Sequence, residues 1–351
     1  MFIETERSRF TGNAEPRFHP ELRRAALLIP RFSLGRKSSG WLRRMRSRRP
    51  VPQPPALPDV AIRDEHIDGP DGNTIRVRIY SPASSAGPRP ALLWIHGGGF
   101  IIGYPEINED QNIELCRELG IVVAAVSYRL GPDNPFPAPL DDCHAALAWL
   151  HENAGTLGID KARIAVGGAS AGAGIAAGLA LLAHDRGDLP IAFQLLVYPM
   201  LDDRTAMRTD VDGRWLRVWS AESNRFGWQS YLGCAPGSHE VSAYAAPARR
   251  ADLRGLPPAW VGVGTCDLFL DEDIAYAIRL NDADVPCDLK IVEGAFHAFD
   301  LVAPKSRVVG EFRRSIAEAL QANLRPERSG EDDSSDAVSA SLEREYAALT
   351  N

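Results

Sequence analysis

Short apolar runs recur along residues 60–324, separated by longer segments whose apolar side chains are spaced as on a helix. The runs predict eight strands, at residues 60–67, 74–80, 91–95, 121–126, 163–166, 191–198, 258–264 and 287–292. The longer segments predict helices at residues 108–119, 140–152, 171–185, 271–281 and 307–324. Because helices alternate with strands after a first hairpin-like pair, we expect an α/β fold in which helices cover both faces of a mostly parallel sheet.

Two segments break this pattern and divide the chain. Residues 1–55 predict a separate N-terminal segment with a short helix at 19–32 and a basic amphipathic helix at 38–49, followed by a proline-rich linker at 50–58. Residues 200–245 form a long irregular insertion within the main domain, which covers residues 56–325. Residues 326–351 are polar and charged, which is typical of a frayed tail. Residues 74–80 alternate polar and apolar side chains, so we expect one face of that strand to be solvated.

Charge is distributed unevenly along the chain. Residues 1–50 contain thirteen Arg or Lys and four Asp or Glu, a balance of +9, so the remaining residues carry −16 of the total net charge of −7. Such an asymmetry is found in basic arms that bind nucleic acid or anionic membranes. The alternative, which we favour, is a basic segment folded onto an acidic body, with no nucleic acid partner.

The cysteines and the N-terminus bear on the compartment. Five scattered cysteines form no C-x-x-C pair, so neither a zinc site nor a disulfide framework is indicated, and we expect a reducing, cytoplasmic compartment. Residues 1–10 lack the apolar core of a secretory signal. No stretch reaches the roughly 18 apolar residues of a membrane span, so we expect no integral membrane segment.

Ser170 is the strongest candidate for chemistry. It lies in the G-x-S-x-G pattern Gly168-Ala169-Ser170-Ala171-Gly172, between a predicted strand and a predicted helix. This setting holds a serine on a tight, strained turn at the carboxyl edge of a sheet. A glycine-rich turn before a packed helix would give the same letters, but the strand before it and the helix after it favour a nucleophile.

A serine hydroxyl needs a base, and the base needs an orienting acid. His297 alone among the eight histidines lies in a loop directly after a late strand, where the carboxyl edge is expected. A purely structural histidine is the alternative. Asp267 follows the strand at 258–264 and is the candidate acid, while Asp202, after the strand at 191–198, is its rival. Ser170, Asp267 and His297 follow one another in the order that α/β-hydrolases use.

A glycine run follows the third predicted strand, as His96-Gly97-Gly98-Gly99-Phe100. Glycines let backbone amides approach a ligand and turn inward, which suits a pair of donors for a tetrahedral oxyanion. A plain loop is the alternative, but the position directly after the third strand favours a partner for the serine turn.

These motifs together resemble the hormone-sensitive-lipase-like family of α/β-hydrolase carboxylesterases. The likeness covers residues 75–320 and rests on the glycine run, Tyr128-Arg-Leu-Gly-Pro-Asp-Asn-Pro-Phe-Pro, the serine motif, Asp267-Leu-Phe-Leu-Asp-Glu and Gly294-Ala-Phe-His297, in that order. Two positions depart from the family pattern: Ala169 stands where the family has Asp, Glu or Thr, and Ala173 stands where it commonly has glycine. Both bear on subgroup and substrate range, and neither supplies triad chemistry.

The resemblance implies a serine esterase that hydrolyses short- to medium-chain carboxylic esters without a cofactor. It implies oxyanion donors at Gly98, Gly99 and Ala171, and a helical cap built from residues 1–55 and about 200–245. Candidate walls of an apolar pocket for a small ester are Phe100, Tyr198, Trp215, Trp219, Leu268 and Phe299, each of which could instead be plain core. An amidase or deacetylase, a long-chain lipase and a non-catalytic small-molecule receptor are the alternatives, and the sequence leaves open whether the chain forms a homodimer.

Overall fold

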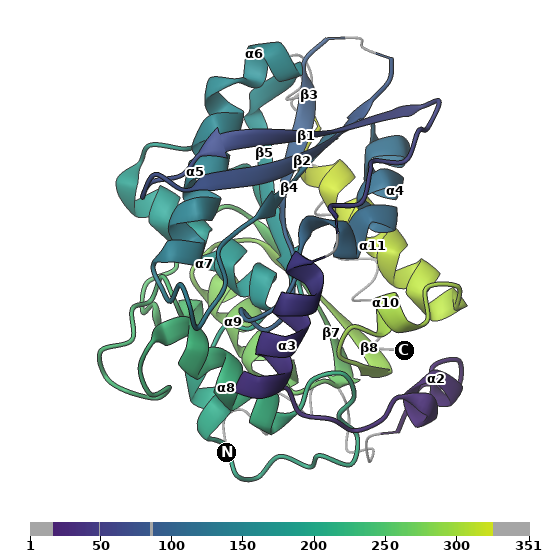
Figure 1. Cartoon of the computed structure of the whole chain (residues 1–351), viewed down its shortest axis with the longest axis vertical. Coiled ribbons are helices and arrows are strands. Elements are labelled where there is room, and N and C mark those ends of the chain that lie inside the picture. Colours follow the sequence, from purple (N-terminus) through teal and green to yellow (C-terminus); the bar gives the residue numbers. More distant parts are fainter. Residues whose placement is uncertain (1–16, 49, 85–86, 326–351) are drawn as a thin grey trace, which may run out of the picture.

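A computed structural model describes residues 17–48, 50–84 and 87–325 of the chain. Its centre is an eight-stranded sheet of order β1-β2-β4-β3-β5-β6-β7-β8 (Figure 1). The strands are β1 (Val60–Asp68), β2 (Thr74–Pro82), β3 (Arg89–Ile95), β4 (Val122–Ser127), β5 (Ile159–Ala169), β6 (Phe193–Val197), β7 (Ala259–Cys266) and β8 (Cys287–Phe296). The predicted α/β class is confirmed, and every predicted strand is present within a few residues of its expected bounds.

One strand, β2, runs against the rest of the sheet. β1 pairs with β2 and β2 with β4 in antiparallel register, whereas β3 to β8 are joined by parallel ladders. Leu93 of β3, for example, lies opposite Ala124 on one side and Val166 on the other. The carboxyl ends of six parallel strands therefore meet at one edge, where open α/β sheets bind their ligands.

Helices cover both faces of the sheet (Figure 1). One face carries α5 (Ala138–Glu152), α6 (Ala154–Leu157), α7 (Ala171–Arg186) and α9 (Leu270–Asp282), and the other carries α4 (Glu109–Leu119), α10 (Phe299–Val302) and α11 (Arg307–Asn323). Successive residues of a strand enter opposite cores: Leu93 belongs to the first and Leu92 to the second. Because both faces are buried, β3 to β6 are apolar along most of their length.

We expected the polar side chains of β2 to face water, and for Arg78 this prediction is wrong. Its side chain is fully buried, and its guanidinium donates to Asp64 at 2.8 and 2.9 Å and to Glu109 at 2.8 Å, with Glu106 also within ion-pair distance. The carboxylates come from β1, from α4 and from the turn before α4. An arginine surrounded by acceptors can be buried, because its charge is paired and its donors are used.

The N-terminal segment forms two helices, α2 (Arg23–Leu28) and α3 (Arg36–Ser47). α2 is shorter than predicted because Pro30 follows it, and Ile29 before the proline is extended. The arginines of α3 contact the body: Arg43 donates to the Gly131 carbonyl oxygen and lies 3.2 Å from Asp133. The contact with Asp133 agrees with the prediction, made from the charge distribution, that the basic N-terminal segment folds onto the acidic body.

The insertion between β6 and β7 contains a 3-10 turn (Asp203–Met207), α8 (Ala221–Leu232) and a second 3-10 turn (Pro247–Arg249). Leu34, just before α3, donates its amide proton to Ser223 of α8 at 2.7 Å, so the N-terminal segment and the insertion touch. The predicted tail at 326–351 and residues 1–16 lie outside the described residues. In the described ranges, no helix combines the length and apolarity needed to span a membrane.

Candidate active site

Ser170 lies at the turn between β5 and α7, with a backbone φ of 57°. A Cβ added at Gly168 or at Gly172 would overlap the carbonyl oxygen of Ile95, so the turn requires glycine on both sides. A non-glycine residue in this backbone region is strained, and such strain is characteristic of functional sites. The fold thus holds the Ser170 hydroxyl at the carboxyl edge of the sheet, as the G-x-S-x-G pattern predicts.

The structure brings Ser170, His297 and Asp267 together. His297 Nε2 lies 2.9 Å from Ser170 Oγ, and His297 Nδ1 lies 2.8 Å from Asp267 Oδ2. The other oxygen of Asp267 accepts the backbone proton of Phe269 at 3.1 Å, which fixes the orientation of the carboxylate. All three side chains are buried. A hydroxyl, an imidazole and an oriented carboxylate in this line can move a proton away from the serine.

Two aromatic rings hold the imidazole of His297 edge-on. Phe269 lies 5.2 Å and Tyr198 4.8 Å from it, measured between ring centroids. Tyr198 has a backbone φ of 37°, and its hydroxyl donates to Asp300 at 2.7 Å. Burial raises the pKa of the Tyr198 phenol and of the Asp300 carboxyl. Sequence reasoning missed Asp300 and Phe269, although both lie within three residues of a predicted site residue.

The glycine run passes directly beside Ser170. A Cβ at Gly97 would approach the Ala169 carbonyl oxygen to 2.9 Å, one at Gly98 would overlap the Ile102 carbonyl, and one at Gly99 would overlap the Trp219 ring. Within the described ranges, the amides of Gly98, Gly99 and Ala171 donate to no other group of the protein. These three amides are therefore available to a ligand at the serine.

His96, at the start of this loop, packs against Tyr128. Its ring stacks on Tyr128 at 4.3 Å, and the Tyr128 hydroxyl donates to the His96 carbonyl oxygen at 2.9 Å. Burial lowers the pKa of His96 to about 4, so the imidazole is neutral at pH 7. A neutral, packed histidine suits a rigid loop.

The rival acid Asp202 points elsewhere. Its carboxylate accepts two side-chain hydrogen bonds from Arg204, both 2.7 Å long. Glu272 lies in the first turn of α9, as predicted, but it is buried and accepts the amide protons of Leu201 and Asp202 at 2.7 and 3.2 Å. Glu272 therefore ties the start of the insertion to the helix that follows Asp267.

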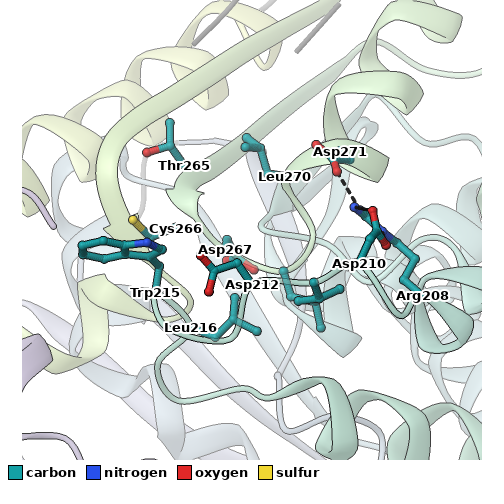
Figure 2. Close-up of a pocket in the computed structure, with 12 residues that line it drawn as sticks. Arg208, Asp210, Asp212, Trp215, Leu216, Thr265, Cys266, Asp267, Leu270 and Asp271 are labelled. Atoms are coloured by element: carbon teal, nitrogen blue, oxygen red, sulfur yellow. Dashed lines mark hydrogen bonds and ion pairs between the residues drawn. The ribbon is translucent and has the colours of Figure 1, made fainter. Parts of the chain in front are cut away.

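The six predicted pocket walls lie in three settings. Trp215 and Leu268 line a cavity of about 130 Å³ that also borders Asp267, between the insertion and the end of β7 (Figure 2). Trp219 covers Gly99, and Tyr198 contacts His297. Phe100 stacks on Tyr231 at 4.0 Å and Phe299 packs on Phe312 at 4.9 Å, so both rings are fully buried among other aromatic side chains. A role in binding substrate remains a prediction for all six.

Metal-binding residue types are not clustered in the described ranges: no group of three His, Cys, Asp or Glu side chains could hold an ion. The cysteines Cys116, Cys143, Cys234, Cys266 and Cys287 are all free thiols.

Comparisons with known proteins agree with this geometry. The family profile of the alpha/beta hydrolase fold matches residues 92–301. Esterase LipI of Mycobacterium tuberculosis is 33% identical over 301 residues, covering 82% of this chain and 90% of its own length. Carboxylesterase NlhH of the same species is 34% identical over 285 residues, covering 80% of this chain and 89% of its own. Among solved structures, a bacterial heroin esterase superposes with a TM-score of 0.79 at 39% identity, covering 88% of this chain and 98% of the other.

Proposed function

The chain belongs to the hormone-sensitive-lipase-like group of the α/β-hydrolase fold family, and from that membership we propose that it is a serine carboxylesterase with Ser170 as its nucleophile. The activity is hydrolysis of carboxylic esters, as in the named esterase relatives. The observation that carries the proposal for the residues is the hydrogen-bonded line from Ser170 through His297 to Asp267.

The first half of the reaction uses each of these groups once. His297 Nε2 takes the hydroxyl proton as Ser170 Oγ attacks the ester carbonyl carbon. The carbonyl oxygen becomes an oxyanion and accepts hydrogen bonds from the amides of Gly98, Gly99 and Ala171, which are preorganised for it. The imidazolium then gives its proton to the alcohol oxygen, the C–O bond breaks, and an acyl-enzyme remains on Ser170.

Water completes the cycle by the same route. His297 takes a proton from water, the hydroxide attacks the acyl carbon, and the proton returns to Ser170 as the carboxylic acid leaves. Asp267 stays ionised throughout, fixes the imidazole tautomer and stabilises its charged form. The N-terminal segment and the insertion act as the cap that limits water and shapes the site.

The substrates of this proposal are small apolar esters with short to medium acyl chains. Apolar surface for such a substrate would come from Trp219 beside Gly99, from Tyr198 beside His297, and from Trp215 and Leu268 in the cavity that borders Asp267. We place the enzyme in the cytoplasm, because all five cysteines are free thiols.

Kinetics of Ser170→Ala on p-nitrophenyl esters of increasing chain length test the proposal. We expect a loss of roughly a million-fold in kcat with an unchanged thermal midpoint, because Ser170 is the only bond-forming group. Ser81→Ala, on β2, is the matched control and should retain full activity. A Ser170→Ala protein that hydrolyses these esters at a rate close to the parent's contradicts the proposal. Faster turnover of anilides or of long-chain triglyceride emulsions would instead indicate the amidase or the lipase alternative.

A further inference from the structure

Helix α3 exposes three large apolar side chains. Trp41 is 61% exposed, and Leu42 and Met45 are each 36% exposed. These side chains are neighbours on one side of the helix, because Trp41 and Met45 are four residues apart and Leu42 and Met45 are three apart. An apolar helix face is ordinarily turned to the core. On α3, by contrast, these three apolar side chains remain exposed.

Polar groups make the contact with the body instead. Ser39 lies on the side of α3 that is turned to the body and is fully buried, with its hydroxyl bonded within the helix to the Gly35 carbonyl oxygen at 2.9 Å. Arg46 lies over the Tyr104 ring, 4.4 Å from the centroid, and 3.8 Å from Glu106. Together with the contacts of Arg43, this side fixes α3 to the protein. The apolar side chains thus stay exposed to water in the folded protein. Their exposure is unfavourable, and a contact that covered them would lower the free energy.

Positive charge surrounds the exposed apolar face. The sequence of α3 contains five basic residues and no acidic one. Lys37 is one turn before Trp41, and Arg48 is two turns after it, so both lie along the same side of the helix. Both side chains are exposed, as is Arg36. A Trp-containing apolar strip with basic residues along it has the composition of a helix that lies in the headgroup layer of a lipid bilayer.

We propose that α3 docks the protein on an anionic lipid surface. Trp41, Leu42 and Met45 enter the boundary between headgroups and acyl chains, while Lys37 and Arg48 meet lipid phosphates and carboxylates. The side that carries Ser39, Arg43 and Arg46 remains on the protein, so docking requires no unfolding. A second copy of the chain fits this surface less well, because a twofold contact would bring each basic rim against its own equivalent.

The position of α3 connects this surface with the serine site. Gly131, whose carbonyl oxygen accepts from Arg43, donates its own amide proton to Phe100 at 2.9 Å, at the end of the glycine run. Figure 1 shows α3 crossing in front of the carboxyl ends of the parallel strands. Docking through α3 therefore turns the proposed cap toward the lipid phase, where apolar esters concentrate.

Flotation with lipid vesicles tests the proposal in the Ser170→Ala protein, so that no hydrolysis contributes. We expect binding to phosphatidylcholine vesicles that contain phosphatidylserine, weaker binding to pure phosphatidylcholine, and weaker binding at high salt. Replacing Trp41, Leu42 and Met45 together by serine should lower the partition coefficient by at least about tenfold. Met207→Ser is the matched control, since Met207 is 56% exposed in the insertion and should leave binding unchanged.

Three results would overturn the proposal. The first is an absence of binding to the anionic vesicles, and the second is equal binding by the triple variant and the control. The third is a monomer–dimer equilibrium, seen by analytical ultracentrifugation without lipid, that the triple variant abolishes, because the face would then be a contact between copies. The triple variant made on the wild-type serine should keep the parent's thermal midpoint, which shows that it is folded.

Discussion

Replacing Asp267 by asparagine distinguishes an orienting acid from a carboxylate that merely lies near His297. In the structure, Asp267 Oδ1 accepts the Phe269 amide proton at 3.1 Å while Oδ2 faces His297 Nδ1 at 2.8 Å. An asparagine here must keep its oxygen on the Phe269 amide, because its NH2 group cannot accept a proton. Its NH2 group therefore faces Nδ1 of His297.

That arrangement forces the wrong tautomer on the imidazole. Nδ1 must accept from the new amide, so the proton moves to Nε2, which faces Ser170 Oγ at 2.9 Å. Nε2 can then no longer take the serine proton. In serine-protease triads this exchange costs about ten-thousand-fold in kcat, equivalent to about 5.4 kcal/mol of transition-state stabilisation. We expect a loss of that order here, with little change in KM.

The assay is initial-rate hydrolysis of p-nitrophenyl acetate, alongside thermal unfolding to verify the fold. Asp202→Asn is the matched control, because Asp202 pairs with Arg204, whose side chain is 56% exposed, and such partly solvated pairs contribute about 0–1 kcal/mol. Asp202→Asn should stay within about fivefold of the parent. If Asp267→Asn keeps more than roughly a tenth of the activity, or if Asp202→Asn loses as much, the assignment of the acid is refuted.

Three further predictions concern the turn, a buried carboxyl and the N-terminal segment. Gly172→Ala should abolish most ester turnover, because the new Cβ would overlap the Ile95 carbonyl oxygen. Gly155→Ala, where the space around the glycine is open, should leave turnover unchanged, and equal kinetics for the two variants would contradict the packing argument. Burial, followed by the nearby carboxyls, raises the pKa of Asp273 well above its ordinary value, and among the described residues neither of its oxygens has a hydrogen-bond partner. The folded state therefore holds the Asp273 proton more tightly than the unfolded state does, so the free energy of unfolding falls as pH rises above about 4. Asp273→Asn should raise the urea midpoint more at pH 8 than at pH 4, and an equal gain at both pH values would contradict this prediction. Deleting residues 1–50 should change the chain-length profile on p-nitrophenyl esters or abolish activity, and an unchanged profile would remove the segment from the cap.

The sheet could be predicted well because its strands are buried on both faces. A strand covered by helices on both sides must be apolar throughout, and such runs at 91–95 and 121–126 stand out from any surrounding sequence. The start of β5 was less visible, because Asp160 and Lys161 at its exposed end interrupt the apolar run. Arg78 could not be anticipated, since its burial depends on carboxylates that only the folded chain assembles.

In the candidate site, too, some residues could be predicted from the sequence and others could not. Ser170, Asp267 and His297 each stand just after a strand, so their meeting at one edge could be expected from the order of elements alone. The contact between Tyr198 and Asp300 spans 102 positions and has no local signature. The orientation of α3 could not be predicted either. The spacing of its residues predicts one apolar and one basic face, but which face is buried depends on contacts with residues 104, 106, 131 and 133, which are distant in sequence.

Labelling with a fluorophosphonate probe, followed by peptide mass spectrometry, tests the central claim most directly. The reagent reacts with a serine only where a base activates the hydroxyl and donors hold the developing anion. We predict one modified peptide, carrying the probe on Ser170, and loss of labelling in His297→Ala at an unchanged thermal midpoint. Modification of a different serine together with loss of esterase activity would contradict the account.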